Sequence, residues 1–313
     1  MKTKSASEFF EADFLTPFEV QGEENMEFIS KTLIEKGWSG DKKYMAVTHA
    51  GEKYLYRVSD ENTYEGKKTE FEMMKKLSAL DIPMCLPVEF GKNEDGVYSV
   101  QTWIEGGDAE EMMPAFSEDK QYAYGFQSGE ILRKIHSIPA PQTQENWETR
   151  FNRKMDRKIA GYLACPIKAE GGERFIEYIS SHRHLLKNRP QTFQHGDYHI
   201  GNMMIGNDGK LFVIDFNRFD FGDPWEEFNR IVWCAQKAPA FARGMLDGYF
   251  EGNVPDVFFE TLALYISSNA LSSVYWAVPF GEKEISVMLD QVKDILSWYD
   301  NMNTPVPSWY KKA

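Results

Sequence analysis

The sequence predicts an α+β protein of two lobes, a small β-rich N-terminal lobe (residues 1–104) and a larger, mostly helical C-terminal lobe (residues 105–313). Three observations support this division. Short alternating apolar runs gather before residue 105, helical periodicity dominates after it, and Gly106-Gly107 follows the last early strand. Because paired glycines are conformationally free, we place the hinge between the lobes there.

The N-terminal lobe is expected to hold a small sheet and two helices. Met26, Ile29 and Leu33 have helical spacing, which predicts a first helix that ends at Gly37. A β-hairpin turns at Gly51, a second helix stops before Pro83, and an alternating segment predicts a further strand. The hairpin strands, the second helix and the further strand are expected at residues 44–48, 54–58, 67–80 and 97–104.

The C-terminal lobe is expected to be helical, with one exception. Two short apolar runs flank Asn207-Asp208-Gly209, which is a strong hairpin signal. Helices are expected near residues 119–136, 150–163, 172–186, 224–237, 240–250, 256–276 and 282–300. Two lobes with a cleft between them are a usual setting for a ligand site.

Composition limits the class of protein. The net charge of −13 argues against nucleic acid as the main partner, because phosphate backbones are bound by an excess of Lys and Arg. The three cysteines form no CxxC pair, which indicates free thiols in a reducing compartment. We see no signal-peptide core and no run of about 20 apolar residues, so we expect a cytoplasmic protein with no membrane partner.

Acidic and histidine side chains are concentrated in FQHGDYHIGNMMIGNDGKLFVIDFNRFDFGDP, residues 193–224. Such a stretch is either a solvated acidic loop or a site for a divalent cation and a reacting hydroxyl. Asp215 ends an apolar run, and Asn202 lies across the predicted hairpin from it. One carboxylate and one amide oxygen, completed by waters and phosphates, suit Mg²⁺. Asp197, on the same loop, can orient an attacking hydroxyl, so the pattern favours phosphoryl transfer.

HGDYHIGN followed by VIDF resembles the signature of the aminoglycoside phosphotransferase family. That family shares a bilobal protein-kinase-like fold with choline, homoserine, fructosamine and macrolide kinases. The resemblance extends from about Gly37 to the C-terminal helices. It implies that Asp197 is the catalytic base, that His195 braces the loop, and that Asn202 and Asp215 hold Mg²⁺.

Further roles follow from the resemblance. His199 and Gly201 look structural, and Asp223-Pro224 resembles the pair that opens the next helix, with Asp223 as its N-cap and Pro224 as its first residue. Ile135-His136 resembles the end of a helix that packs under the catalytic loop. In the N-terminal lobe, the implied nucleotide-binding residues are Ser39, Gly40, Arg57, Glu70, Thr102, Trp103 and Ile104.

The N-terminal lobe departs from the family pattern in two places. Arg57 stands where a phosphate-binding lysine is expected, and arginine offers a planar fork in place of a point charge. Lys42 and Lys53 are alternative phosphate contacts. No GxGxxG is present, so the backbone N–H groups of Ser39 and Gly40 are the expected phosphate cradle.

The sequence therefore predicts an ATP- or GTP-dependent, Mg²⁺-requiring O-phosphotransferase that acts on a small hydroxylated molecule. The acidic balance favours a cationic acceptor such as an aminoglycoside, which would mean a role in antibiotic resistance. A metabolic kinase of a sugar or amino alcohol, of the choline, homoserine or methylthioribose type, is the alternative. A catalytically inactive nucleotide-binding module and a metal-dependent phosphate hydrolase also remain open.

Overall fold

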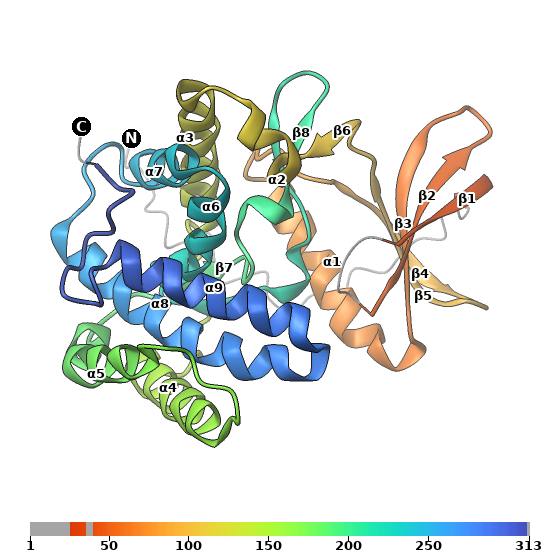
Figure 1. Ribbon diagram of the computed structural model, residues 1–313. Helices are drawn as coiled ribbons and strands as arrows, with labels where there is room; N and C mark the ends of the chain where they lie inside the picture. Colours follow the sequence, from red (N-terminus) through yellow and green to blue (C-terminus); the bar gives the residue numbers. More distant parts are fainter. Residues whose placement is uncertain (1–25, 36–39, 312–313) are drawn as a thin grey trace, which may run out of the picture.

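The computed structural model describes residues 26–35 and 40–311. A mixed α+β architecture is confirmed, with a sheet region at the N-terminal side and a helical region at the C-terminal side (Figure 1). The sheet has five antiparallel strands in the order β1-β2-β3-β5-β4. Their bounds are Phe28–Ile34 (β1), Lys42–Thr48 (β2), Lys53–Ser59 (β3), Pro87–Asn93 (β4) and Gly96–Thr102 (β5).

The predicted first helix is wrong, because the chain from Phe28 to Ile34 forms strand β1 at the edge of the sheet. Backbone pairing with β2 determines the structure here, with Lys31 opposite Ala46. Ile29 and Leu33, which gave the helical spacing, are 57% and 52% exposed and so form no buried helical face. Gly37, the expected helix end, lies outside the described residues.

The other elements of the sheet region follow the sequence more closely. The hairpin β2–β3 and strand β5 are confirmed, and helix α1 (Tyr64–Ser78) packs its Phe71 ring 5.5 Å from Phe90 of β4. Strand β4 was not predicted. It begins at a proline and has an irregular register between Pro87 and Glu89, so it lacks a clear alternation.

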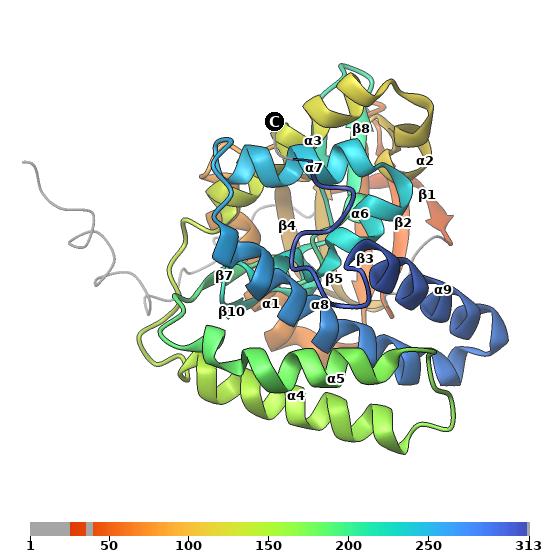
Figure 2. The same cartoon turned by 60° about the vertical axis from the view of Figure 1, so that its left-hand side comes forward.

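The helical region contains the elements that the periodicity predicts, with shifted ends. Helices α4 and α5 lie side by side against α8 (Figure 2). The expected 172–186 helix becomes 3-10 at Arg183, and the expected 224–237 helix begins as a 3-10 turn at Glu226. The bounds are Ala109–Met112 (α2), Glu118–Ile135 (α3), Trp147–Ala164 (α4), Gly172–His182 (α5), Ile231–Lys237 (α6), Pro239–Tyr249 (α7), Asp256–Ala277 (α8) and Glu282–Trp298 (α9).

Two small sheets lie between the sheet region and the long helices. The hairpin predicted at residues 207–209 joins β8 (Met203–Gly206) to β9 (Leu211–Val213), and β7 (Thr192–Gln194) pairs with β10 (Asp220–Gly222). These strands hold both ends of the acidic stretch. The HGDYHIGN motif therefore runs between the short strands β7 and β8 and packs on one large apolar core.

The glycine pair after β5 has a different role from the one expected. Gly106 lies in β6 (Gly106–Asp108), which pairs with β8. A side chain at Gly106 would lie 2.2 Å from the Ile205 carbonyl oxygen. Gly106 is thus needed for the close approach of β6 to β8, while the irregular segment before it connects the two regions. The lobe boundary at residue 105 stays a prediction. Within the described chain, no helix is long and apolar enough to cross a membrane.

Candidate active site

The loop that follows β7 is held from below by His195. This ring is fully buried, and its Nε2 donates to the Ile214 carbonyl oxygen at 3.0 Å. Its Nδ1 accepts the Asp197 N–H at 3.3 Å. A ring that donates at one nitrogen and accepts at the other is neutral. Burial lowers the pKa of His195, which agrees with that protonation state.

Glu227 is the second support of this loop. Its carboxylate is 1% exposed and accepts the Gly196 N–H at 3.0 and 3.1 Å and the Tyr198 N–H at 3.4 Å. Gly196 has φ +83°, and a Cβ there would lie 2.0 Å from the Arg218 carbonyl oxygen. The loop therefore needs glycine at 196 and a buried acceptor beneath it.

The sequence did not identify Glu227 as a support. The role of Glu227 depends on a loop that is 31 residues away in the chain, so no local pattern indicates it. His136 is where the resemblance placed it, beneath the catalytic loop. Its Nε2 lies 3.9 Å from Glu227 Oε2, and its Nδ1 lies 2.9 Å from the Tyr249 hydroxyl.

Asp197 presents a carboxylate surrounded by basic groups. Its Oδ1 lies 3.6 Å from His199 Nε2 and 3.4 Å from Arg230 Nε, and its Oδ2 lies 3.5 Å from Arg218 Nη1. Burial favours the neutral acid, but the contact with His199 and the charges of Arg230 and Arg218 outweigh it. The pKa of Asp197 is therefore well below its usual range, and the group is ionised at neutral pH.

Asn202 and Asp215 lie next to one another through the backbone. The Ile214 N–H donates to the Asn202 carbonyl oxygen at 3.0 Å, and the Asn202 Nδ2 donates to the Asp197 carbonyl oxygen at 2.9 Å. With Nδ2 engaged, Oδ1 is the amide atom suited to a cation. Asp215 has φ +68°, a left-handed conformation that Asp tolerates better than most residues. This turn directs the chain out of β9 at the point where the metal is expected.

The donor set fits Mg²⁺. The described residues contain no cluster of three or more His, Cys, Asp or Glu able to hold a metal ion. A pair of oxygen ligands, one carboxylate and one amide, is what Mg²⁺ uses when substrate phosphates and waters complete its shell. Asn202 and Asp215 are the residues that would hold it.

Arg57 reaches this site from the sheet region. It is 5% exposed and donates to Asp215 Oδ1 at 3.0 Å and to Asp41 Oδ2 at 2.9 Å. Glu70 does not pair with it, because Glu70 contacts Lys67 at 3.1 Å and Lys67 also contacts Asp41 at 2.7 Å. Glu70 is therefore connected to Arg57 only indirectly, by ion pairs that run from Glu70 to Lys67, from Lys67 to Asp41 and from Asp41 to Arg57. No sequence pattern predicts this role, since Asp41 follows a segment without a motif.

The register of the sheet shows which lysines lie on the same face as Arg57. Lys43 is opposite Arg57 and therefore on the same face of the sheet, whereas Lys42 is opposite Val58 on the other face. Lys42 there lines a cavity of about 180 Å³ together with Tyr44 and Tyr56. Lys53 is engaged with Glu105 at 2.6 Å.

Lys43, which the sequence analysis did not single out, is the lysine beside Arg57. Burial lowers its pKa, and the nearby Asp215 carboxylate opposes that shift. Within the described chain its ammonium forms no ion pair within 4 Å. It is therefore a cation on the same face of the sheet as Arg57 that forms no ion pair with a carboxylate in the described chain.

The connection from β5 to β6 carries the three residues expected at the purine. The Thr102 N–H donates to the Leu86 carbonyl oxygen at 2.9 Å, and its hydroxyl accepts the Leu86 N–H at 2.9 Å. Thr102 is thus committed to the sheet, which leaves Trp103 and Ile104 as the irregular backbone after it. Of the expected phosphate cradle, Gly40 forms a bend just before β2, and Ser39 lies outside the described residues.

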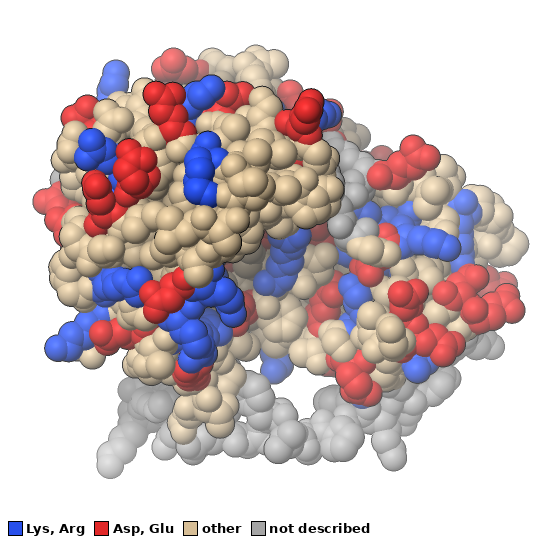
Figure 3. Space-filling view, turned by 60° about the horizontal axis from the view of Figure 1, so that its bottom comes forward, with Lys and Arg blue, Asp and Glu red and all other residues tan. Residues whose placement is uncertain are grey.

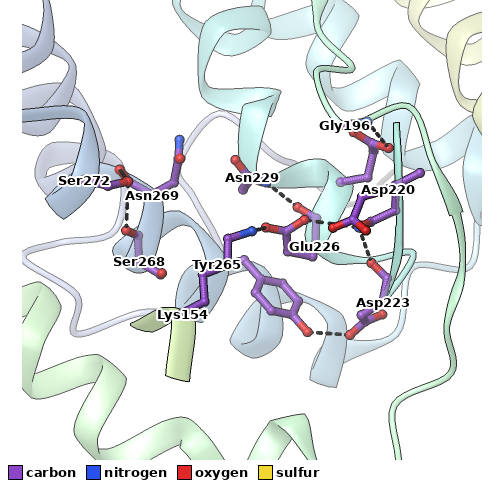
Figure 4. Close-up of polar contacts among 12 residues, drawn as sticks. Lys154, Gly196, Asp220, Asp223, Glu226, Asn229, Tyr265, Ser268, Asn269 and Ser272 are labelled. Carbon is purple, nitrogen blue, oxygen red and sulfur yellow. Dashed lines mark hydrogen bonds and ion pairs between the residues drawn. The ribbon is translucent and has the colours of Figure 1, made fainter. Parts of the chain in front are cut away.

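The N-cap of the 3-10 helix that begins at Glu226 is Trp225, so the N-cap prediction for Asp223 is wrong; Asp223 has another structural role. It accepts the Trp225 N–H at 2.9 Å, but it is fully buried and also accepts Arg189 Nε at 2.6 Å and the Tyr265 hydroxyl at 2.5 Å (Figure 4). Pro224 lies in a turn, and the helical residues begin at Glu226. The prediction that Pro224 is the first helical residue is therefore wrong.

A β-sheet region joined to a helical region, with this loop between them, is the arrangement of a kinase-like fold. The model of the phosphotransferase enzyme family matches residues 31–258, which is more than half of the chain. The chain belongs to that family and is a small-molecule kinase, as the HGDYHIGN…VIDF resemblance implied. No curated protein sequence matches it significantly.

Solved structures share the fold at low sequence identity. The GDP complex of wild-type aminoglycoside 2'-phosphotransferase-IIIa has a TM-score of 0.67 and 14% identity, covering 87% of this chain and 93% of its own. ADP-bound APH(2'')-Ib has a TM-score of 0.59 and 18% sequence identity, and the match covers 86% of this chain and 95% of its own. A thermostable mutant of APH(4)-Ia with ADP and hygromycin B has a TM-score of 0.61 and 16% sequence identity, and the match covers 86% of this chain and 94% of its own.

Proposed function

We propose that this protein transfers the γ-phosphoryl group of ATP or GTP to a hydroxyl of a small molecule in a Mg²⁺-dependent reaction. One observation carries the proposal. Asn202 is hydrogen-bonded both to the Asp197 carbonyl and to the segment that presents Asp215, so a base and two oxygen ligands lie in one hydrogen-bonded unit. Phosphoryl transfer requires this division of roles.

Asp197 is the group that faces the acceptor. Its ionised carboxylate accepts a hydrogen bond from the acceptor hydroxyl, aligns that oxygen with the γ-phosphorus and takes the proton as the new P–O bond forms. Because its pKa is low, Asp197 acts mainly by orientation and is a weak base. The nucleoside diphosphate leaves as the bond to the γ-phosphorus breaks. When bound, Mg²⁺ would neutralise charge on the phosphate oxygens.

The sheet region would hold the nucleotide. Arg57 and Lys43 lie on its inner face, where a triphosphate would meet both cations. The purine would lie against the backbone of Trp103 and Ile104. Nucleotide-bound relatives of the same fold support this placement, since one carries GDP and another ADP. Glu70 acts at a distance, through Lys67 and Asp41, on the orientation of Arg57.

The acceptor is a small hydroxylated compound. Structures with the same fold contain gentamicin and streptomycin, at 18% and 17% identity, so an aminoglycoside is one candidate. A sugar or amino alcohol is the other. The intact Asp197, Asn202 and Asp215 argue against an inactive nucleotide-binding module.

The test is nucleoside-diphosphate release from Mg·ATP and Mg·GTP by the purified full chain. The acceptor panel holds an aminoglycoside, a macrolide, choline, homoserine, methylthioribose, glycerate and glycerol 3-phosphate. We expect release that requires an acceptor and falls about 100-fold or more in Asp197→Ala, with nucleotide affinity unchanged.

The matched control is Asp208→Ala, because Asp208 is an exposed aspartate at the tip of the β8–β9 hairpin. It should retain full activity. Acceptor-dependent release that survives in Asp197→Ala would remove Asp197 from the reaction. Release that proceeds equally without any acceptor would replace the kinase by a hydrolase.

A further inference from the structure

The surroundings of Asp197 are basic, although the whole chain carries a net charge of −13. Arg218 and Arg230 both contact the one Asp197 carboxylate, so this group of three carries a net positive charge. Lys and Arg side chains are visible in the hollow between the helical and sheet regions (Figure 3). The charge immediately around Asp197 is therefore opposite in sign to the charge of the chain.

Nearby acidic groups on the helical side are already neutralised. Glu226 accepts Lys154 of α4 at 3.0 Å and Gln194 at 3.1 Å (Figure 4). Asp220 of β10 accepts Arg150 of α4 at 3.1 Å. Neither carboxylate is left to attract an ammonium group of a substrate, because each one already has a basic partner from α4.

Lys154, Lys158 and Arg150 of α4 form a basic wall beside the site, and Lys158 is the one of these three that has no acidic partner in the described chain. It lies one helical turn after Lys154 on α4 and so shares its face. Within the described residues it forms no ion pair or hydrogen bond, whereas Lys154 does. Burial lowers its pKa to about 7, helped by the charge of Lys154 and opposed by Glu226; Arg230 and Arg157 lower it further. A partly buried ammonium without a counter-ion is costly, so an anion would relieve it.

Two uncharged groups beside this wall also lack partners. Asn229 Oδ1 and Ser268 Oγ are buried and accept or donate no hydrogen bond in the described chain. Asn229 belongs to the same 3-10 turn as Glu226, and Ser268 belongs to α8, which packs on α4 (Figure 4). Buried polar atoms are rarely left unpaired, so these are available to the hydroxyls of a ligand.

We propose that the acceptor of this kinase carries an anionic group, a carboxylate or a phosphate, and that Lys158 with Arg230 binds it while the acceptor hydroxyl meets Asp197. The inference rests on the proposed function, since it names the substrate class of that same site. It departs from the cationic acceptor that the net charge suggested, because a polycation would meet the unpaired Lys158 and the net positive charge of Arg218, Arg230 and Asp197.

The first experiment needs no turnover. Lys158 is acetylated with acetic anhydride at pH 7.5 in the presence of Mg²⁺ and a non-hydrolysable ATP analogue, and the modification is quantified by mass spectrometry. Glycerate, glycerol 3-phosphate, glycerol and kanamycin are compared at constant ionic strength. We expect glycerate or glycerol 3-phosphate to slow Lys158 acetylation about fivefold or more, and glycerol and kanamycin to leave it unchanged.

Lys293, an exposed lysine of α9, is the internal control and should be modified equally in every arm. Protection by glycerate alone assigns a carboxylate, and protection by glycerol 3-phosphate alone assigns a phosphate. Absence of protection by both anions, or equal protection by kanamycin, overturns the inference. Because these readouts do not depend on phosphoryl transfer, they stand or fall separately from the kinase proposal.

The second experiment uses turnover with the acceptor panel. Lys158→Gln should raise the KM for an anionic acceptor about tenfold, with kcat and the KM for Mg·ATP nearly unchanged, while Lys293→Gln changes none of them. An unaltered acceptor KM in Lys158→Gln contradicts the inference. If only cationic acceptors are phosphorylated, the kinase stands and the anionic acceptor is wrong.

Discussion

The catalytic loop and the inner face of the sheet supply the two halves of one site in different ways. In the loop, buried groups hold the backbone: His195 binds the Ile214 carbonyl and Glu227 binds the Gly196 N–H. On the sheet, charged side chains hold one another, with Arg57 between Asp41 and Asp215. The loop is thus fixed by hydrogen bonds to main-chain atoms, and the sheet face by ion pairs.

This difference decides what each half tolerates. Main-chain hydrogen bonds to buried groups leave no freedom, because an unsatisfied N–H in the core costs about 1–3 kcal/mol. Ion pairs between side chains can exchange one partner for another, and a nucleotide phosphate is such a partner. The loop should therefore respond to substitution with loss of stability or geometry, and the sheet face with loss of nucleotide affinity.

The largest effect is expected at the buried carboxylate under the loop. Glu227→Ala leaves the Gly196 and Tyr198 N–H groups without an acceptor and should lower the free energy of unfolding by about 2–5 kcal/mol. Urea unfolding measures it. Glu251→Ala, which removes an exposed carboxylate paired with Arg133, should cost less than about 1 kcal/mol. Equal costs would mean that Glu227 does not support the loop.

Alanine substitutions at Gly196 and Gly209 distinguish the cost of a Cβ clash from the cost of a left-handed backbone conformation. Gly196 and Gly209 have φ +83° and +80°, but only Gly196 has no room for a Cβ. Both alanine variants should lose about 1–2 kcal/mol from the left-handed conformation. Gly196→Ala should also shift the loop and lower kcat about 100-fold, since small misplacements are costly in catalysis. Steady-state kinetics test this, and similar kcat values for the two variants would refute it.

On the sheet face, Arg57→Lys should weaken Mg·ATP binding about tenfold and leave the fold stable. A lysine ammonium cannot span both Asp41 and Asp215 as the guanidinium does. Isothermal titration calorimetry gives the dissociation constant. Arg133→Lys, at an exposed ion pair, should bind nucleotide like the wild type. If Arg57→Lys also does so, Arg57 only joins the two regions.

The smallest effect concerns pH. Because the folded-state pKa of His195 is lowered, the unfolded chain binds the proton more readily. The resulting stability is present above the unfolded pKa of about 6.5 and is lost as pH falls through the folded value. Urea unfolding of wild type should therefore show stability falling below pH 6.5, with a shallower fall in His195→Gln. The same slope in both would exclude His195 as the titrating group.

The sequence predicted the helical half and the loop well, because their signals are local. Asp197, Asn202 and Asp215 lie within one motif, and the predicted hairpin between Asn202 and Asp215 forms. Lys43 was missed as the neighbour of Arg57 because strand register decides which lysine lies beside it, and Asp41 was missed because its ion pair with Arg57 joins residues that are distant in sequence. Strand β1 was misread as a helix, since its apolar residues are few and exposed. Glu227 was missed as a support because its loop is distant in sequence.

The charge of the site could not be read from composition. The net charge of −13 describes the whole chain, whereas Arg218 and Arg230 are the charged groups that contact Asp197. Whether a basic side chain is neutralised depends on whether the fold brings a carboxylate within ion-pair distance of it. Lys154 and Lys158 are four residues apart and have the same side chain, yet only Lys154 meets a carboxylate.

The central claim is that Asp215 joins the two halves through a metal ion and the nucleotide. The most direct test is the dissociation constant for ATP, measured with and without Mg²⁺, in wild type, Asp215→Asn and the exposed control Asp208→Asn. We predict that Mg²⁺ tightens ATP binding about tenfold or more in wild type and Asp208→Asn and has no such effect in Asp215→Asn. Full Mg²⁺-dependent tightening in Asp215→Asn would contradict the account.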